Sequence, residues 1–459
     1  MYTIDFTKPV HIHFIGIGGI SMSGLAEILL KEGFTVSGSD SKESTLTDHL
    51  TEKGAQIFYG QRASNIIDGI DLVVYTAAIH PDNPEFACAK EKGLPMLTRA
   101  QLLGQIMRNY DTSIAVAGTH GKTTTTSMIS EVLLAADMDP TISVGGILKT
   151  IGGNIRVGKS GNFITEACEY TNSFLHFYPK ISVILNIEED HLDFFKDLED
   201  IRNSFHRFAK LLPKDGTLVI NGDIDRLDEI TGDLDCKLVT YGTNPSATYH
   251  AANVTHDELG EASFDLVKNG EFVDRISLSV SGDHNVSNAL AALAVADLLD
   301  VNVSVAKKGL KEFHGTDRRF EYKGSLGDVT VIDDYAHHPT AIRYVIEATR
   351  VRYPGKKIVA IFQPDRFSRG ARFAKEFAQE MDKADYPYFC PFPENAKHED
   401  GIDIDIYDIS KNSARAKVIT EDEAGVKELM QYDNCVFLFM SSKDIYKFEE
   451  MLIEAKKSI

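Results

Sequence analysis

A loop of glycine, lysine and threonine at residues 118–124 has the composition of a phosphate-binding turn. It lies between an apolar, strand-like run and a helical pattern. Gly118 and Gly121 allow backbone N–H groups to point at phosphate oxygens. Lys122 supplies a cation for the terminal phosphates, and the Thr123 hydroxyl suits Mg²⁺. The usual pattern has a glycine six residues before the lysine, where this chain has valine, so the loop is a shorter variant that still predicts phosphate binding.

A second glycine-rich turn, residues 16–24, follows an apolar run and opens a helical pattern. Glycines in such a turn let a diphosphate approach the N-terminus of the helix. The dinucleotide-binding pattern needs glycine where this chain has Ser21, which disfavours a nicotinamide cofactor and leaves another nucleotide diphosphate open. Asp40 follows the next strand, where an acid commonly meets ribose hydroxyls. A turn that binds nothing is the alternative for this motif taken alone.

An acid and a histidine follow two later strands of the same unit. Glu166 ends the strand predicted at 162–166, and His191 follows the strand predicted at 181–187. Because the carboxyl ends of parallel strands share one edge, Thr123, Glu166 and His191 can meet around a metal ion bound to a nucleotide. Mg²⁺ prefers oxygen ligands, so a histidine is a less usual partner. For His191 alone, a polar loop residue is the alternative.

Asn285 and Asn288 stand at the start of a strongly apolar, alanine-rich helical pattern. Polar residues before a helix are typical of caps, and this is the first interpretation. A hydrogen bond to the edge of a nucleotide base is the functional alternative.

Two polar segments, 333–339 and 362–370, each follow a predicted strand in the last third of the chain. Ligands bind at this edge of an open parallel sheet. Arg366 and Arg369 are spaced to clamp a carboxylate or a phosphate. For either arginine taken singly, a solvated helix face is the alternative.

The elements that must position these residues alternate between strands and helices. This βαβ order is typical of parallel sheets with helices on both faces. A β-rich segment at 236–281 interrupts the alternation, and charge density rises at 314–323, where a hinge is predicted. The main predicted strands are at 10–15, 34–40, 71–78, 113–117, 162–166, 181–187, 218–221, 329–333, 357–362 and 435–440.

The fold class expected from this order is α/β with three domains. Their expected boundaries are 1–106, 107–314 and 315–459.

The composition is that of a globular protein with an excess of acid. The 459 residues include 48 basic and 68 acidic ones, for a net charge of −20. This disfavours a broad nucleic-acid or anionic-membrane surface, which needs excess lysine and arginine. The five cysteines have no Cys-x-x-Cys spacing, so free thiols in a reducing cytosol are predicted. No signal-peptide pattern and no apolar stretch of about 20 residues is present, so a cytoplasmic protein without membrane insertion is expected.

Taken in order along the chain, these motifs resemble those of the Mur ligases of bacterial cell-wall synthesis. The resemblance covers nearly the whole chain and is most specific in the pair of glycine loops. Other matching segments are TEACEY (165–170), NIEEDHLDFF (186–195), GDHNVSNALAA (282–292), DRRFE (317–321), DDYAHHPT (333–340) and FQPDRFSR (362–369).

The resemblance implies a UDP-binding Rossmann-like domain, a central P-loop-type ATPase domain and a Rossmann-like C-terminal domain. It also implies that ATP and Mg²⁺ are used to phosphorylate the carboxylate of a UDP-sugar. An amino-acid amine then attacks the acyl phosphate, giving an amide, ADP and phosphate. The implied substrates are UDP-N-acetylmuramate and L-alanine, and a monomer or homodimer is expected.

Roles for individual residues follow from the same resemblance. The implied catalytic residues are Lys122, His191, His337, Arg366 and Arg369. The implied ATP-binding residues are Gly118, Thr119, His120, Gly121, Lys122, Thr123, Thr124, Asn285, Asn288, Arg319 and Asp334. The implied UDP-sugar-binding residues are Gly16, Gly18, Ser21 and Asp40. The implied metal ligands are Thr123, Glu166 and His191.

Two segments depart from the family pattern. The family usually has histidine where this chain has Asp365, and Gly-Ala-Gly where it has Ser441, Ser442 and Lys443. A carboxylate beside the amino acid's own carboxylate would repel it. Asp365 is therefore expected to accept hydrogen bonds from one of the two arginines or to meet the incoming ammonium, with a solvated loop residue as the alternative.

Three other functions fit part of the pattern. A recycling ligase that adds a tripeptide to the same sugar shares the opening motifs. A nicotinamide-dependent oxidoreductase would use the first glycine loop but not residues 118–124. A non-catalytic UDP-sugar sensor would bind the sugar nucleotide without amino-acid-dependent turnover of ATP.

Overall fold

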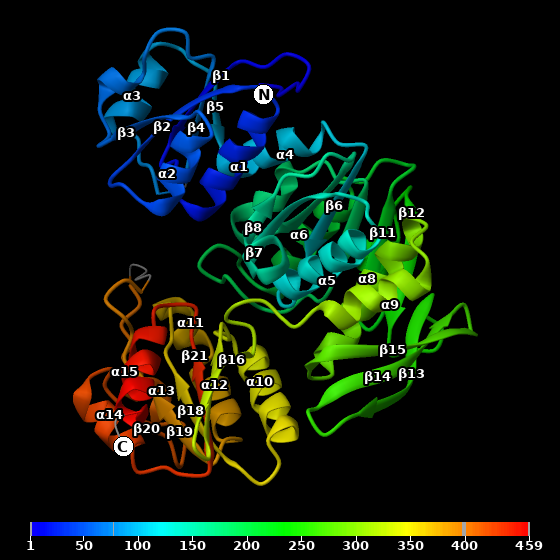
Figure 1. The fold of residues 1–459 in the computed structure, drawn as a ribbon, viewed down its shortest axis with the longest axis vertical. Helices are drawn as coiled ribbons and strands as arrows, with labels where there is room; N and C mark the ends of the chain where they lie inside the picture. The colour runs from blue at the N-terminus through cyan, green and yellow to red at the C-terminus, as the bar shows by residue number, and fades with distance from the viewer. Residues whose placement is uncertain (1, 77, 397–400, 458–459) are drawn as a thin grey trace.

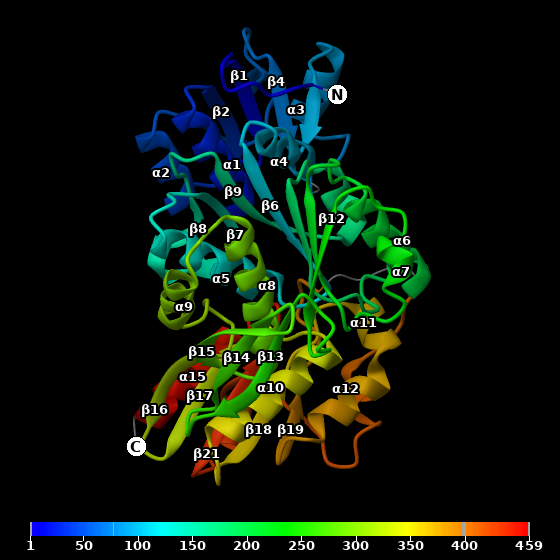
Figure 2. The ribbon, with the colours of Figure 1, turned by 90° about the vertical axis from the view of Figure 1, so that its right-hand side faces the viewer.

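The computed structural model describes residues 2–76, 78–396 and 401–457. The chain forms three α/β domains, each built around its own sheet, which follow one another from the N-terminus to the C-terminus (Figure 1). The turned view shows the central domain between the other two (Figure 2). The predicted fold class, α/β with three domains, is confirmed.

The N-terminal domain is a five-stranded parallel sheet with the strand order β3-β2-β1-β4-β5. The chain leaves β1 toward β2 and β3 and then returns to the other side as β4 and β5. The turn after β1 therefore lies at a topological switch point, where ligands bind in such sheets. The elements are β1 (His11–Ile15), α1 (Ile20–Lys31), β2 (Thr35–Asp40), α2 (Thr45–Glu52), β3 (Gln56–Tyr59), η1 (Ala63–Asn65), β4 (Leu72–Tyr75), α3 (Pro84–Glu91), β5 (Met96–Thr98) and α4 (Arg99–Met107).

The central domain contains a ten-stranded sheet in the order β15-β14-β13-β12-β11-β10-β6-β9-β7-β8. Helix α8 is buried along nearly its whole length, because its alanines allow close packing against the sheet. The elements are β6 (Thr112–Ala117), α5 (Lys122–Ala135), β7 (Thr141–Leu148), η2 (Lys149–Ile151), β8 (Gly153–Arg156), β9 (Asn162–Ala167), η3 (Tyr170–His176), β10 (Ile181–Ile184), α6 (Leu198–Ala209), β11 (Thr217–Asn221), α7 (Asp228–Thr231), β12 (Lys237–Gly242), β13 (Tyr249–His256), β14 (Glu261–Lys268), β15 (Glu271–Ser281), α8 (His284–Leu298) and α9 (Val303–Glu312).

The C-terminal domain has a six-stranded sheet in the order β16-β17-β21-β18-β19-β20. Strand β21 is buried at every position, since it lies between β17 and β18 with helices on both faces. The elements are β16 (Glu321–Leu326), β17 (Val329–Asp334), α10 (Pro339–Arg352), β18 (Lys357–Phe362), α11 (Phe367–Arg372), α12 (Ala374–Met381), β19 (Tyr386–Phe389), α13 (Ile406–Ser410), β20 (Lys417–Val418), α14 (Glu423–Leu429), β21 (Cys435–Met440) and α15 (Tyr446–Lys457).

Some local predictions need correction. The strand predicted at 181–187 ends at Ile184, where the chain turns toward the phosphate loop. Asn285 is not a helix cap: α8 begins at His284, and the residue in the cap position, Asp283, makes no side-chain cap hydrogen bond. The strand predicted at 71–78 is observed at Leu72–Tyr75, and its Ala77 lies outside the described residues.

Two predictions from composition can also be compared with the structure. All five cysteines are free thiols, as predicted. Among the described residues, no helix has the length and apolar character needed to cross a membrane.

Candidate active site

Two glycines with positive φ shape the loop between β6 and α5. Gly118 has φ 150° and Gly121 has φ 84°, in conformations that residues with a Cβ rarely adopt. Asn186 ties the loop to the end of β10: its Oδ1 accepts from the His120 N–H at 2.8 Å, and its Nδ2 donates to the His120 carbonyl at 3.1 Å. Because α5 begins at Lys122, the N-terminus of the helix faces the loop and favours an anion.

The ammonium of Lys122 lies over this loop. It donates to both carboxylate oxygens of Glu169, at 2.9 and 3.2 Å, and to the carbonyls of Gly118 and Thr119. Burial lowers the pKa of Lys122, but the charge and hydrogen bond of Glu169 and the charges of Cys168 and Glu166 together outweigh it, and the pKa is raised above its ordinary value. The lysine is therefore charged at neutral pH.

Glu169 links the phosphate loop to the predicted metal site. Oε1 of Glu169, one of the two oxygens that accept from Lys122, lies 3.8 Å from Nε2 of His191. His191 stacks on Tyr170 with ring centroids 4.5 Å apart, and its Nδ1 is buried with no hydrogen-bond partner among the described residues. A buried nitrogen without a partner fits a metal ligand.

The other two predicted metal ligands lie against one segment of β7. The Glu166 carboxylate accepts a hydrogen bond from the Gly145 N–H at 2.5 Å. A Cβ built on the next residue, Gly146, would lie 3.1 Å from the Thr123 side chain. The contacts of Thr123 and Glu166 are with β7, whereas those of His191 are with Glu169 and Tyr170. A hydroxyl, a carboxylate and an imidazole are donors whose chemistry would fit Mg²⁺ with several waters.

Asn285 and Asn288 lie beside the phosphate loop. Oδ1 of Asn288 accepts from the Thr125 hydroxyl at 3.1 Å, and its Nδ2 donates to Asn285 at 3.0 Å. A Cβ on Gly121 would come within 2.8 Å of the same Oδ1. The first turn of α8 and the first turn of α5 are thus packed against each other.

Asp334 holds the segment that links the central and C-terminal domains, where a hinge is predicted. Its carboxylate accepts from the backbone N–H groups of Phe320 and Ala336, at 2.6 and 2.7 Å. Arg319 lies 4.8 Å from the ring of Tyr335. Burial raises the pKa of Asp334 to about 6, although the charge of Arg319 opposes this shift. The Asp334 carboxylate therefore fixes the backbone at Phe320 and Ala336, and the Arg319 side chain lies over the Tyr335 ring.

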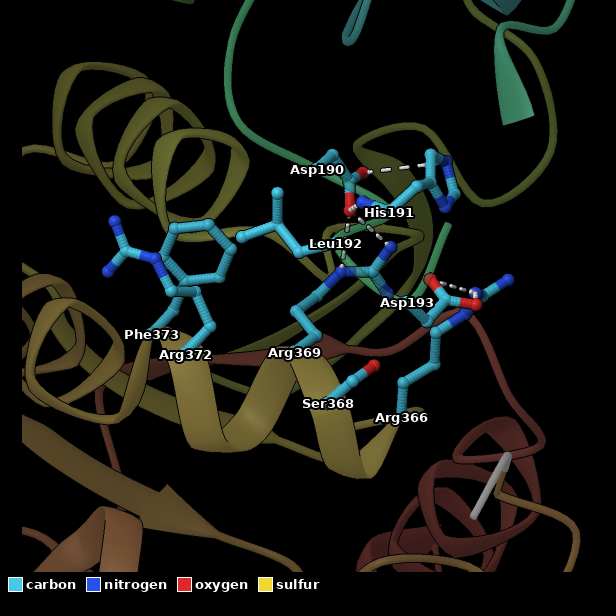
Figure 3. Close-up of a pocket in the computed structure, with 9 residues that line it drawn as sticks. All are labelled: Asp190, His191, Leu192, Asp193, Arg366, Ser368, Arg369, Arg372 and Phe373. Carbon is cyan, nitrogen blue, oxygen red and sulfur yellow. Dashed lines mark hydrogen bonds and ion pairs between the residues drawn. The ribbon is translucent and has the colours of Figure 1, made fainter. Parts of the chain in front are cut away.

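Helix α11 faces the acidic segment 188–193 of the central domain across a small pocket (Figure 3). Three arginines, Arg366 at the N-cap of the helix and Arg369 and Arg372 within it, meet three acids in reverse order along the segment. Arg369 donates to Oδ1 of Asp190 from Nε at 3.1 Å and from Nη2 at 2.8 Å. The other two pairs are Arg366 with Asp193, at 3.2 Å, and Arg372 with Glu189.

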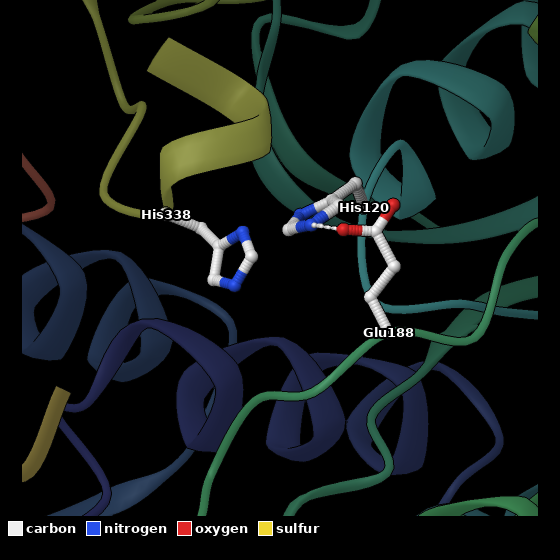
Figure 4. A group of neighbouring side chains, drawn as sticks. All are labelled: His120, Glu188 and His338. Carbon is white, nitrogen blue, oxygen red and sulfur yellow. Dashed lines mark ion pairs between the residues drawn. The ribbon is translucent and has the colours of Figure 1, made fainter. Parts of the chain in front are cut away.

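His120, Glu188 and His338 meet where the C-terminal domain contacts the phosphate loop (Figure 4). Their possible ligand atoms lie within 4.8 Å of one another. However, Nε2 of His338 donates to the Glu189 carbonyl at 3.0 Å, and its Nδ1 accepts from the Thr340 N–H at 3.3 Å. Both ring nitrogens are engaged, so this group is an interdomain contact rather than a metal centre.

His337 and Asp365 lie near Arg369 in the C-terminal domain. Nδ1 of His337 donates to the Tyr335 carbonyl at 2.7 Å, and burial lowers the pKa of His337 to about 3. Asp365 accepts from Nη1 of Arg369 at 2.7 Å and from the Ser442 hydroxyl at 2.6 Å. Asp365 is therefore buried and hydrogen-bonded to an arginine, which is one of the two roles expected for it.

The four residues predicted at the UDP end lie together at the switch point of the first sheet. Gly16 has φ 85°, and the Gly18 N–H donates to Oδ2 of Asp40 at 2.8 Å. A Cβ on Gly18 would lie 2.8 Å from the same oxygen, so a larger residue there would displace the Asp40 carboxylate. Ser21 is exposed on the first turn of α1.

Three family profiles match consecutive parts of the chain. They are described as Mur ligase family, catalytic domain (residues 11–111), Mur ligase middle domain (116–296) and Mur ligase, glutamate ligase domain (318–442). The chain belongs to the Mur ligase family. A curated relative from Agathobacter rectalis, named UDP-N-acetylmuramate--L-alanine ligase, is 60% identical over 385 residues, which are 84% of each chain.

Two solved Mur ligase structures share the fold. The UDP-N-acetylmuramate-alanine ligase of Thermotoga maritima is 30% identical with a TM-score of 0.77, covering 98% of this chain and 99% of that one. A murein peptide ligase from Psychrobacter arcticus is 26% identical with a TM-score of 0.72, again covering 98% and 99%. The family assignment predicted from the motifs is confirmed.

Several acids of the Mur ligase site were not among the predicted site residues. Glu169, Asp190 and Asp193 connect the predicted Lys122, His191, Arg366 and Arg369. They stand within the segments 165–170 and 186–195, close in sequence to the predicted Glu166 and His191. That closeness was the signal that could have found them. Their partners come from other domains or distant strands, which no local pattern reveals.

Proposed function

We propose that this chain is an ATP-dependent ligase that joins L-alanine to the carboxylate of UDP-N-acetylmuramate in the synthesis of peptidoglycan precursors. The observation that carries the proposal is the convergence of the phosphate loop, the acidic segment 188–193 and the arginines of α11. A site of this kind holds nucleotide, acceptor and amino acid together, so the reaction becomes effectively intramolecular. The 60% identity to a ligase named for L-alanine supports that amino acid over a tripeptide.

Lys122 stabilises the negative charge of the transferring phosphate in this proposal. Its ammonium is buried, charged and oriented by Glu169. One preorganised group of this kind is worth on the order of 10²-fold or more in rate. Backbone N–H groups of the loop and the N-terminus of α5 would bind the phosphates of ATP, while Asn285, Asn288, Arg319 and Asp334 would border the rest of the nucleotide.

Thr123, Glu166 and His191 would hold Mg²⁺. When bound, Mg²⁺ supplies positive charge to the phosphate oxygens. The β7 backbone fixes Glu166 through the Gly145 N–H, and the stacking of His191 on Tyr170 fixes the imidazole plane. These contacts keep the donors in place before substrates arrive.

His337 receives the amine in this proposal. Its low pKa keeps the imidazole neutral, and because Nδ1–H donates to the Tyr335 carbonyl, Nε2 is left as the acceptor. A neutral acceptor can take a hydrogen bond from the ammonium of L-alanine and orient its nitrogen toward the acyl phosphate. Arg366 and Arg369 would line the amino-acid end of the site.

The remaining parts of the proposal concern the whole chain. Gly16, Gly18, Ser21 and Asp40 would bind the UDP end of the sugar nucleotide, and the domain boundaries are 1–106, 107–314 and 315–459. The enzyme acts as a monomer or homodimer in the cytoplasm, where ATP and UDP-sugars are available.

The test measures phosphate release by the purified chain with ATP, Mg²⁺ and UDP-N-acetylmuramate, with each amino acid added in turn. Release that depends on L-alanine, with a product of the mass of the amide, is expected. A parallel arm offers the tripeptide L-alanyl-D-glutamyl-diaminopimelate. Turnover only with the tripeptide would replace the proposal by the recycling reaction, and sugar-nucleotide binding without any turnover would indicate a sensor.

A further inference from the structure

Arg369 is surrounded by carboxylates of its own chain. Each of its three guanidinium nitrogens donates a hydrogen bond: Nε and Nη2 to Asp190, and Nη1 to Asp365. The side chain is only 5% exposed. A third carboxylate brought to this guanidinium would meet two buried negative charges already present, which costs free energy in a site with little solvent.

Asp365 is held in this position from a second side. Its Oδ1 accepts from Arg369, and its Oδ2 accepts from the Ser442 hydroxyl at 2.6 Å. The pairing follows from the sheet: β18 and β21 are neighbours, with Phe362 opposite Met440, so the loops after these strands lie side by side. The two places where the sequence departs from the family pattern are therefore one hydrogen-bonded unit.

Arg366 has different surroundings. It is 19% exposed and donates from Nη1 to both carboxylate oxygens of Asp193, at 3.2 and 3.3 Å, with its guanidinium 4.8 Å from the ring of Tyr170. It lines the interdomain pocket (Figure 3). A substrate carboxylate on this guanidinium would meet one carboxylate of the chain, Asp193, where on Arg369 it would meet two. If it displaced Asp193, that carboxylate would keep the hydrogen bond from the Tyr170 hydroxyl.

We propose that Asp365 and Ser442 are positioning residues that commit Arg369 to the interdomain ion pair with Asp190, and that Arg366 is the guanidinium that binds the carboxylate of the amino acid. The proposal rests on the proposed function, since it assigns the amino-acid site of that reaction. It assigns Arg369, within α11, to a structural contact and Arg366, at the N-cap of the same helix, to a substrate contact.

The experiment compares L-alanine with L-alaninamide, which keeps the amine but lacks the carboxylate. The readout is the ratio of kcat/KM for the two amines, measured by phosphate release with saturating ATP and UDP-N-acetylmuramate. A site with a charged partner for the carboxylate discriminates by about 10²-fold or more, because the amide leaves that partner without its counter-charge. The wild-type chain is expected to prefer L-alanine by this order.

In Arg366→Ala, we expect this preference to collapse. In Asp365→Asn, Ser442→Ala and Arg369→Lys, we expect it to persist, while kcat falls about 10-fold, as is common for residues that act through another side chain. Asp365→Asn and the double variant Asp365→Asn/Ser442→Ala should have equal kcat, since Ser442 acts only through Asp365. The matched control is Asp408→Asn, which alters an exposed acid paired with Lys411 in the same domain.

The outcomes separate the two proposals. A wild-type chain without amino-acid-dependent phosphate release would overturn the proposed function. An active wild-type chain whose preference collapses in Asp365→Asn or Arg369→Lys, or persists in Arg366→Ala, would overturn the division of roles. A kcat loss in Ser442→Ala that adds to that of Asp365→Asn would overturn the coupling of these two residues. Arg369→Lys keeps the charge, and Ser442→Ala is milder still, so the ratio can be measured on folded enzyme.

Discussion

Arg369 of the C-terminal domain donates two hydrogen bonds to a single oxygen of Asp190 in the central domain, at 2.8 and 3.1 Å. Both side chains are buried. Burial raises the pKa of Asp190, but the positive charges of Arg369 and of the neighbouring histidines together outweigh it and hold the pKa well below its usual range. The next residue is His191, so this ion pair joins α11 to the segment that carries the proposed metal ligand.

Asp190→Asn should weaken the contact between the two domains. Leaving a buried charge uncompensated costs about 3–5 kcal/mol. Arg369 would keep its second carboxylate partner, Asp365, so we expect a cost below that range. We expect a lower kcat and, in small-angle scattering, a larger radius of gyration. Asp408→Asn, on an exposed part of the C-terminal domain, is the control. Unchanged kinetics and scattering in Asp190→Asn would show that the pair does not hold the domains together.

Lys122→Ala should abolish turnover and leave binding of UDP-N-acetylmuramate nearly intact. The lysine lies in the central domain, whereas the glycine turn at 16–24 lies in the first sheet. The expected loss in rate is on the order of 10²-fold or more. Calorimetric titration with the sugar nucleotide measures the second part. Lys180→Ala, at an exposed lysine paired with Asp215, is the control, and an equally steep fall in sugar-nucleotide affinity would contradict the separation.

Gly121→Ala should reduce ATP turnover far more than Gly152→Ala. Both glycines have positive φ, so both substitutions pay a backbone cost of roughly 1 kcal/mol. Only at Gly121 would the new Cβ lie 2.8 Å from Oδ1 of Asn288, while nothing lies within 4 Å at Gly152. Thermal unfolding and steady-state kinetics of the two variants check this. Equal losses of activity in the two variants would mean that the positive φ of Gly121, and not its contact with Asn288 of α8, makes the substitution harmful.

Asp334→Asn should change how stability depends on pH. The folded-state pKa of Asp334 is raised to about 6, so its contribution to stability is full below the unfolded-state value and is lost as pH rises through about 6. Between pH 7 and pH 5 the wild-type chain should therefore gain about 1 kcal/mol relative to the variant. Chemical denaturation at the two pH values measures the difference. If the unfolding free energy of the wild-type chain minus that of the variant is the same at both pH values, or is larger at pH 7, the raised pKa is contradicted.

Much of the site was readable because its signals are local. The two glycine turns, each between a strand and a helix, were predicted at residues 16–24 and 118–124, and the structure has both turns there. The hairpin of β7 and β8 was not predicted, since its glycine-rich sequence lacks the alternation of apolar residues that marks a strand. Yet this hairpin provides Gly145, whose N–H holds Glu166.

By itself, the sequence determined the α/β class, the three alternating units and the family, because glycine turns, apolar runs and motif order are properties of neighbouring residues. Only the tertiary structure decided which charged and polar side chains meet. Lys122 and Glu169 are 47 residues apart, Asp365 and Ser442 are 77 apart, and Asp190 and Arg369 are 179 apart. Strand order and domain packing bring these groups together, and burial then makes each pairing obligatory, since an isolated buried charge is too costly to keep.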